Sequence, residues 1–245
     1  MFGFGAKKTL QQPFLVDVHS HLVPGIDDGV QTVDESIALL EQFQRLGYRH
    51  IITTPHIMGD YYQNTPETIN TGLSQVQAAI QQHQHLTITI SAAAEYYLDE
   101  YLLDLLNTDQ QLLLFGNKYL LFETGFLNQP ALMHEFVFMA QSKGFKPVLA
   151  HPERYVWLQE FPDKIEELHN RGVLFQINVS SLTGYYSRPA KKLAEQLINL
   201  NYVAFIGSDC HNKKHFGVVH EALTSKKILK QLSKTQVLNN SLANL

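Results

Sequence analysis

Strand-like and helix-like segments alternate from residue 14 to residue 206, and this alternation restricts the fold more than any other feature. Seven short apolar segments have the length and composition of β-strands, and helical patterns separate most of them. Parallel strands need such crossover connections, so the pattern predicts an α/β fold, either a barrel or a doubly wound sheet. The predicted strands are Phe14–Val16, His50–Thr54, Leu86–Ala94, Tyr119–Phe122, Lys146–Ala150, Val173–Ile177 and Val203–Ile206.

Capping signals mark the start of the first two helices. Thr32 and Glu35 have the Thr-x-x-Glu spacing of a capping box, and Gly47 is placed to end that helix. Thr65 followed by Pro66 predicts an N-cap with proline at the first helical position. Further helical patterns are predicted over residues 98–106, 130–142, 165–170 and 189–200.

Length and composition indicate one large globular domain. A chain of 245 residues with no linker or repeat suits a single α/β barrel, expected over residues 14–245 after an N-terminal tail of residues 1–13. The net charge of −4 argues against binding to nucleic acid or an anionic membrane surface. One cysteine, no secretory signal and no apolar run of about 20 residues predict a cytoplasmic protein without a membrane span.

Almost every predicted strand is followed by histidine or carboxylate side chains. The carboxyl ends of parallel strands meet at one end of a barrel, so these residues should converge. His50 is at the start of a strand, so we interpret it as structural, and Cys210 should point away from its two neighbours as a packed residue. The candidate metal ligands are His19, His21, Asp28, His56, Glu95, Glu123, His151, Asp209 and His211.

This ligand set exceeds what one metal ion needs. A zinc-like site takes three or four protein ligands, so the set suffices for two or three ions if a carboxylate bridges them. Imidazole and carboxylate donors without thiolate suit Mn, Fe, Zn or Mg. Such a cluster generates a hydroxide nucleophile and binds phosphoryl oxygens, which indicates phosphoryl chemistry.

Phosphoryl transfer also needs positive charge on the phosphate oxygens. Arg154 lies three residues after His151 and has the planar fork that binds phosphate. The alternative is a surface arginine paired with Glu153 or another acid. Lys213, Lys214 and His215 place further positive charge beside Asp209 and His211, and are the other candidates for phosphate binding.

Four motifs carry a family resemblance: His19-Ser20-His21-Leu22-Val23-Pro24-Gly25-Ile26-Asp27-Asp28-Gly29, Thr54-Pro55-His56, His151-Pro152-Glu153-Arg154 and Ser208-Asp209-Cys210-His211-Asn212. With their order and spacing, the sequence resembles the polymerase-and-histidinol-phosphatase (PHP) superfamily. Within it, the chain is similar to the bacterial manganese-dependent protein-tyrosine phosphatases of capsule and exopolysaccharide loci. The resemblance implies a distorted barrel of about seven βα units.

The resemblance also implies a centre of three divalent ions, most often Mn²⁺. His19, His21, Glu95 and Asp209 would hold one ion; Glu95 would bridge to a second held by Glu123 and His151; Asp28, His56 and His211 would hold the third. A metal-bridging hydroxide would attack phosphorus, with Arg154, Asp209 and His211 as catalytic residues. The expected substrate is a phosphotyrosine protein, in particular a bacterial tyrosine kinase of polysaccharide export. The family has a second arginine after the Asp-x-His pair, where this chain has Lys213, Lys214 and His215.

Aromatic residues in two further loops could form a substrate rim. These are Tyr61 and Tyr62 after His56, and Tyr185, Tyr186 and Arg188 after the sixth strand. Aromatic and arginine side chains often anchor peptide contacts. The alternative is that these loops pack on the barrel and that Arg188 begins the next helix.

Three other functions remain open from the sequence. A small-molecule phosphatase of the histidinol-phosphate type could use the same centre. A phosphodiesterase or nuclease of the superfamily is disfavoured by the negative charge. A barrel that binds metal but serves as an interaction module is favoured only by the missing arginine. The sequence does not predict the oligomeric state.

Overall fold

The strands pair in parallel, as the alternation predicts. The computed structural model describes residues 13–108 and 110–243, and in these residues all pairings between the strands named here are parallel. The strands are β1 (Val16–Asp17), β2 (His50–Thr53), β3 (His56–Ile57), β4 (Thr89–Ala92), β5 (Glu95–Tyr97), β6 (Tyr119–Glu123), β7 (Lys146–Ala150), β8 (Leu174–Asn178) and β9 (Val203–Gly207).

The strands form two sheets that together make a distorted barrel. One sheet has the order β1-β2-β4 and the other β3-β5-β6-β7-β8-β9. β3 follows β2, and β5 follows β4, after a break of two residues, so the chain leaves one sheet and enters the other twice. A parallel bridge between Ser20 and Cys210 connects the segments that follow β1 and β9. The predicted (β/α)7 barrel of the PHP type is therefore confirmed as a distorted, parallel α/β architecture.

Side chains close the barrel between β1 and β9, a junction that we call the seam. The side-chain nitrogen Nδ2 of Asn239 donates to the backbone carbonyl oxygens of Val16 and Ile206 at 3.0 and 2.7 Å. The side-chain oxygen Oδ1 of Asn239 accepts from the backbone amide of Ile206 at 3.0 Å. The Asp17 carboxylate accepts from the backbone and the hydroxyl of Ser208 at 2.8 and 2.7 Å. Polar side chains thus take the place of a continuous strand pairing at the seam.

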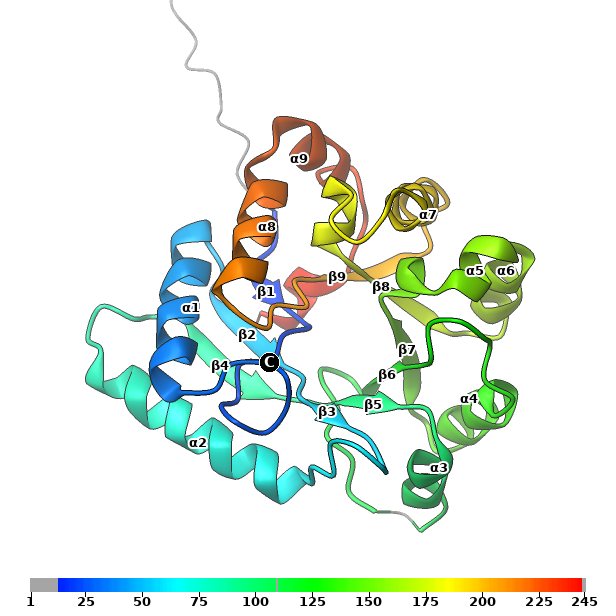
Figure 1. Ribbon diagram of the computed structural model, residues 1–245, viewed down its shortest axis with the longest axis horizontal. Helices are drawn as coiled ribbons and strands as arrows, with labels where there is room; N and C mark the ends of the chain where they lie inside the picture. The colour runs from blue at the N-terminus through cyan, green and yellow to red at the C-terminus, as the bar shows by residue number, and fades with distance from the viewer. Residues whose placement is uncertain (1–12, 109, 244–245) are drawn as a thin grey trace, which may run out of the picture.

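The helices form an outer ring around the strands (Figure 1). The capping predictions are confirmed: Thr32 and Glu35 form a capping box, Thr65 caps the next helix, and Gly47 ends the first with a φ of 101°. The helices are α1 (Val33–Leu46), α2 (Pro66–Gln82), α3 (Glu100–Asn107), α4 (Met133–Ser142), α5 (Val156–Glu160), α6 (Asp163–Asn170), α7 (Arg188–Asn199), α8 (Lys213–Thr224) and α9 (Lys226–Leu232), with the 3-10 turns η1 (Pro152–Arg154), η2 (Val179–Thr183) and η3 (Asn239–Leu242).

Apolar side chains fill the barrel below its carboxyl-terminal mouth. Val18, Ile52, Leu121, Val148 and Phe205 belong to one buried cluster formed by residues of different strands and the segments that follow them. The interior is therefore a packed core rather than a channel, and it supports the polar cluster above it. None of the helices within residues 13–108 and 110–243 has the length and hydropathy needed to cross a bilayer. Of the predicted N-terminal tail, residues 1–12 lie outside the described part of the chain.

Candidate metal centre

The segment after β1 brings the two histidines of the His-x-His motif to one side. Its backbone is held on both flanks: the His21 amide donates to the Cys210 carbonyl at 3.0 Å, and the Thr54 amide donates to the Ser20 carbonyl at 2.7 Å. The Nε2 atoms of His19 and His21 are 3.3 Å apart, and both rings are fully buried. Two imidazole nitrogens that face each other in a dry site fit a shared cation.

The other ring nitrogen of each histidine is already occupied. His19 Nδ1 lies 2.7 Å from Gln176 Oε1, and His21 Nδ1 lies 2.8 Å from Asp27 Oδ2. Both partners are acceptors, so the rings donate from Nδ1, and Nε2 is the atom that remains for a metal ion. Partners of this kind fix the tautomer of metal-binding histidines. Sequence reasoning missed both residues: Asp27 had a signal as the neighbour of Asp28, and Gln176 had only its polarity within an apolar strand.

Glu95 is at the centre of the cluster. Its Oε2 lies 3.1 Å from His19 Nε2 and 3.5 Å from His21 Nε2. Oε2 is also 3.2 Å from His56 Nδ1, while Oε1 is 2.9 Å from His151 Nε2. A buried carboxylate that faces four imidazoles has the position of a bridging ligand.

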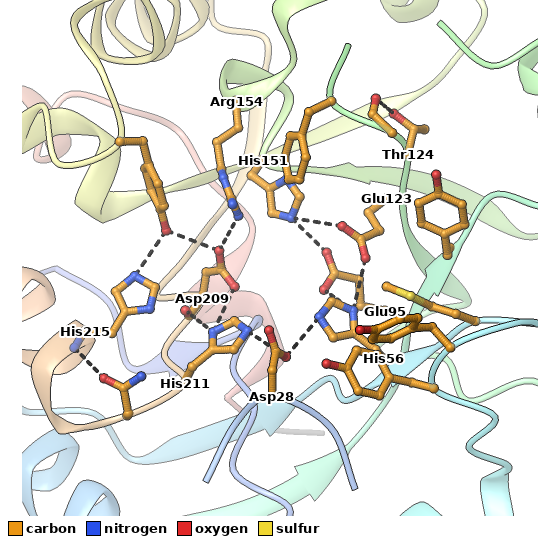
Figure 2. Close-up of a pocket in the computed structure, with 18 of the residues that line it drawn as sticks. Asp28, His56, Glu95, Glu123, Thr124, His151, Arg154, Asp209, His211 and His215 are labelled. Carbon is orange, nitrogen blue, oxygen red and sulfur yellow. Dashed lines mark hydrogen bonds and ion pairs between the residues drawn. The ribbon is translucent and has the colours of Figure 1, made fainter. Parts of the chain in front are cut away.

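His56 and Glu123 complete a second ligand group with Glu95. His56 Nδ1 lies 3.1 Å from Glu123 Oε1, and His151 Nε2 lies 3.8 Å from Glu123 Oε2. Among the described residues, His56 Nδ1 and Glu123 Oε1 are buried atoms without a hydrogen-bond partner. An imidazole nitrogen and a carboxylate oxygen left in this state fit a cation bound between them. Figure 2 shows both side chains pointing toward Glu95.

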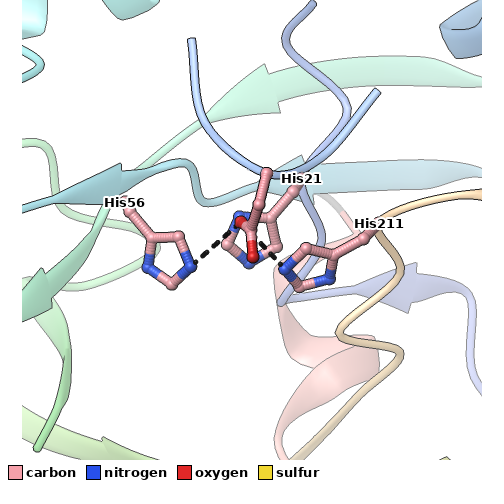
Figure 3. A group of neighbouring side chains, drawn as sticks. His21, His56 and His211 are labelled. Carbon is pink, nitrogen blue, oxygen red and sulfur yellow. Dashed lines mark ion pairs between the residues drawn. The ribbon is translucent and has the colours of Figure 1, made fainter. Parts of the chain in front are cut away.

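A third group lies nearer to solvent. Asp28 Oδ1 is 3.4 Å from His56 Nε2 and 3.3 Å from His211 Nε2. His211 Nδ1 donates to the Asp209 carbonyl at 2.9 Å, which again leaves Nε2 free. Figure 3 shows the side chains of His21, His56 and His211 close together, with the His21 and His211 rings stacked at 3.9 Å. Ligand atoms of Asp28 and these three histidines all lie within 4.8 Å of one another.

Asp209 connects the cluster to Arg154. Its Oδ1 faces the metal side, 3.4 Å from His19 Nε2. Its Oδ2 accepts from Arg154 Nη1 at 3.0 Å, from Asn178 Nδ2 at 2.6 Å and from the Tyr186 hydroxyl at 3.2 Å. Glu153, the alternative partner of Arg154, is instead buried and accepts hydrogen bonds from η2 and the end of β8. Asn178 and Tyr186 thus support a predicted ligand from behind, a role that sequence reasoning did not assign.

Two of these residues adopt left-handed backbone conformations. His151 has a φ of 34° and Asp209 a φ of 51°. Such conformations cost about 1–3 kcal/mol each in a residue other than glycine and cluster at functional sites. Lys118 and Asn201 share this conformation outside the cluster. His151 follows β7 directly and Asp209 follows β9 after one residue, where the chain must turn while the side chains point inward.

The electrostatics show that the cluster requires positive charge. Burial alone would lower the pKa of His19, but the Glu95 and Asp209 carboxylates raise it to about 10. Burial also lowers the pKa of His211, but the hydrogen bond to Asp28 and the charge of Asp209 raise this pKa to about 9. Despite burial, the facing histidines hold the pKa of Glu95 and of Asp209 well below the usual range. The negative charge of the carboxylates is thus balanced by protonated histidines or, when metal is bound, by metal cations.

The cluster forms the floor of a cavity of about 690 Å³. Besides predicted ligands, the cavity is lined by Arg154, Lys214 and His215 and by the predicted rim residues Tyr61, Tyr62, Tyr185 and Tyr186. Tyr62 stacks on His56 at a ring distance of 5.4 Å. All predicted ligands except the fully buried His19 and His21 therefore line one mouth, together with most of the predicted rim.

Some predicted residues lie elsewhere or carry no charge. Lys213 lines a separate pocket beside α1. Arg188 is the first residue of α7, which agrees with the alternative prediction that it begins this helix, and it lines another pocket. Lys214 lines both the pocket beside α1 and the cavity above the cluster, whereas Lys213 lines only the pocket beside α1. Burial lowers the pKa of His215 to about 4, so its imidazole is neutral at neutral pH. Lys214 is thus the remaining flanking cation at the mouth.

Residues 15–241 match the family described as capsular polysaccharide synthesis, CpsB/CapC. Tyrosine-protein phosphatase YwqE from Bacillus subtilis is 30% identical over 82% of this chain and 78% of its own length. Tyrosine-protein phosphatase CpsB from Streptococcus agalactiae serotype V is 31% identical over 81% of this chain and 83% of its own. A chain from the crystal structures of YwqE and of CpsB from Streptococcus pneumoniae, described as unique metal-dependent tyrosine phosphatases, superposes with a TM-score of 0.75 at 28% identity, over 89% of this chain and 91% of that one.

Proposed function

This chain belongs to the CpsB/CapC family of capsular polysaccharide synthesis, and from that premise we propose that it is a metal-dependent tyrosine-protein phosphatase, a phosphoric monoester hydrolase. The observation that carries the proposal is the convergence of the predicted ligands into three overlapping groups at one mouth, beside Arg154. The names and the metal dependence of its relatives agree with that site.

We propose that the site holds three divalent ions, with Mn²⁺ as the physiological metal. His19, His21, Glu95 and Asp209 would hold the first, Glu95, Glu123 and His151 the second, and Asp28, His56 and His211 the third, with His56 also facing the second through Nδ1. Nitrogen and oxygen donors without thiolate suit this metal. When bound, such ions lower the pKa of a water molecule and offset the charge of the phosphoryl oxygens.

The remaining chemistry belongs to the side chains of the mouth. The Arg154 guanidinium supplies N–H donors that fit two phosphate oxygens, with Lys214 as a second cation. A tyrosine phenolate has a pKa of about 10, so its departure needs less help from an acid than that of an alkoxide. Tyr61 is 79% exposed at the edge of the cavity, where it can contact the polypeptide that carries the phosphotyrosine.

We further propose that the substrate is a bacterial tyrosine kinase of polysaccharide export and that the protein acts in the cytoplasm. The family description connects the chain to capsular polysaccharide synthesis, and relatives named tyrosine-protein phosphatases imply a phosphotyrosine protein, which a tyrosine kinase of the same process would provide. A single, buried cysteine is compatible with a reducing compartment.

Hydrolysis of an aryl phosphate by the purified protein tests the proposal. We expect Mn²⁺ to stimulate release of phosphate, a chelator to abolish it, and His151→Ala or Asp209→Ala to remove it while circular dichroism stays unchanged. His220→Ala is the matched control, since His220 is exposed on α8 and lies outside the lining of the cavity. Wild-type rates in either ligand variant would refute the site.

A substrate panel tests the specificity. Phosphotyrosine peptides should be hydrolysed with a higher kcat/KM than histidinol phosphate. The opposite order would identify a small-molecule phosphatase, and no hydrolysis of any substrate by metal-loaded protein would identify a metal-binding interaction module.

A further inference from the structure

The guanidinium of Arg154 lies against two aromatic rings. Its central carbon is 4.7 Å from the centroid of the Phe126 ring and 4.4 Å from that of the Tyr186 ring. Two rings this close to one carbon would touch if they shared one face of the guanidinium, and no contact between these two rings is found among the described residues. The rings therefore lie on different sides of the guanidinium.

Each ring is held in place by separate contacts. The Tyr186 ring packs against the rings of Tyr185 at 5.0 Å and His215 at 6.1 Å. The Tyr186 hydroxyl also contacts Asp209 Oδ2, Asn178 Nδ2 and His215 Nε2 at 3.1–3.2 Å. The Phe126 ring packs on the Tyr155 ring at a centroid distance of 5.5 Å. The backbone carbonyl of Phe126 accepts from the Val156 amide at 2.8 Å, so the loop that carries Phe126 is fixed to the segment that follows Arg154. Both rings thus belong to the rigid surroundings of the metal-ligand cluster.

Phe126 is 39% exposed, although it is a large apolar residue at a polar site. It follows Glu123 by three residues, and its ring also lies 6.1 Å from the His151 ring. The core gains little from a side chain in this position. The contact with Arg154, rather than burial in the apolar core, therefore explains the position of Phe126.

From these contacts we propose that Phe126 and Tyr186 are positioning residues that hold the Arg154 guanidinium between their rings, with its N–H edge directed at the metal-ligand cluster. The inference rests on the proposed role of Arg154 in phosphate binding. The rings shield two sides of the guanidinium and leave its N–H edge uncovered. Nη1 donates to Asp209 Oδ2 at 3.0 Å, and the other N–H groups of that edge can bind an anion. Affinity for phosphate should therefore depend on a ring that does not itself contact phosphate.

Phe126→Leu tests the proposal in the Mn²⁺-loaded enzyme. Leucine keeps the apolar volume but has no π face, so we expect KM for an aryl phosphate and the inhibition constant of inorganic phosphate to rise together, about five- to tenfold. kcat should change less than twofold, because the contact acts alike on bound substrate and transition state. Phe126→Tyr keeps the ring and should retain the wild-type constants.

A double-mutant cycle separates this role from a direct contact with substrate. In Arg154→Lys, which lacks the planar fork, Phe126→Leu should change both constants less than twofold. The proposal is overturned if Phe126→Leu raises KM but leaves phosphate inhibition unchanged, if the effect persists in Arg154→Lys, or if Phe126→Tyr fails to retain the wild-type constants. Wild-type phosphate inhibition in Arg154→Lys would instead refute the phosphate role of the arginine, and the inference with it.

Discussion

Gln176 links two predicted metal ligands from behind, and its replacement tests whether this link sets metal affinity. Its Oε1 accepts from His19 Nδ1 at 2.7 Å, and its Nε2 donates to Asn178 Oδ1 at 3.0 Å. Asn178 in turn donates to Asp209 Oδ2 at 2.6 Å. Gln176→Met keeps an unbranched side chain of similar volume and removes both hydrogen bonds.

The magnitude follows from these contacts. Without Oε1, the His19 proton is free to move from Nδ1 to Nε2, where it blocks the ligand atom. Loss of such a partner typically weakens metal binding or activity about 10- to 100-fold, or about 1.4–2.7 kcal/mol. Two buried polar atoms also lose a partner, at about 1–3 kcal/mol each, so unfolding should occur at a lower temperature.

The assay is the Mn²⁺ concentration that gives half-maximal aryl-phosphate hydrolysis in a chelator-buffered series. It should rise about 10- to 100-fold in Gln176→Met, and activity should recover in part at saturating Mn²⁺. Gln82→Met, an exposed position at the end of α2, is the matched control and should behave as wild type. A folded Gln176→Met protein with an unchanged Mn²⁺ requirement would show that the tautomer of His19 is set by something else.

Three further outcomes are expected. Gly207→Ala should reduce activity at least tenfold and lower the melting temperature, because a Cβ there would lie 2.6 Å from the Cβ of His19; wild-type kinetics would contradict this close approach. Tyr186→Phe keeps the ring but loses the hydroxyl 3.2 Å from Asp209 Oδ2, so the Mn²⁺ requirement should rise while the inhibition constant of phosphate stays within about twofold; the reverse pattern would contradict the division of roles. Metal affinity should rise with pH between about pH 6 and 9, because His19 and His211, with metal-free pKa values of about 10 and 9, must release protons to bind metal; a flat dependence in metal titrations would contradict this.

The sequence was most informative where chemistry and periodicity coincide. Each predicted strand overlaps an observed one, and polar residues immediately after apolar strands, such as His151 after β7, lie at the mouth as expected. Such residues could be found because the carboxyl ends of parallel strands must meet. The alternation alone left the choice between barrel and open sheet undecided, and the resemblance supplied it.

Contacts that depend on the angular position of a residue could not be predicted. Gln176 lies within β8, and its contact with His19 depends on how β8 faces β1 across the barrel. α8 was not predicted, so the two lysines at its start were treated alike, although only Lys214 lines the cavity. Arg188 follows a loop whose path decides which side of the barrel it reaches. Sequence spacing gives none of these angles.

The seam imposes an order of assembly on the protein. Asp17 and Ser208, which hydrogen-bond across the seam, are 191 positions apart in the sequence. A ribosome that adds about 5–20 residues per second therefore synthesises Ser208 roughly 10–40 s after Asp17. During that time His19 and His21 have emerged without the neighbours that align them. The first ligands made are thus among the last to be set in place, and a metal ion that arrives early meets an unfinished site.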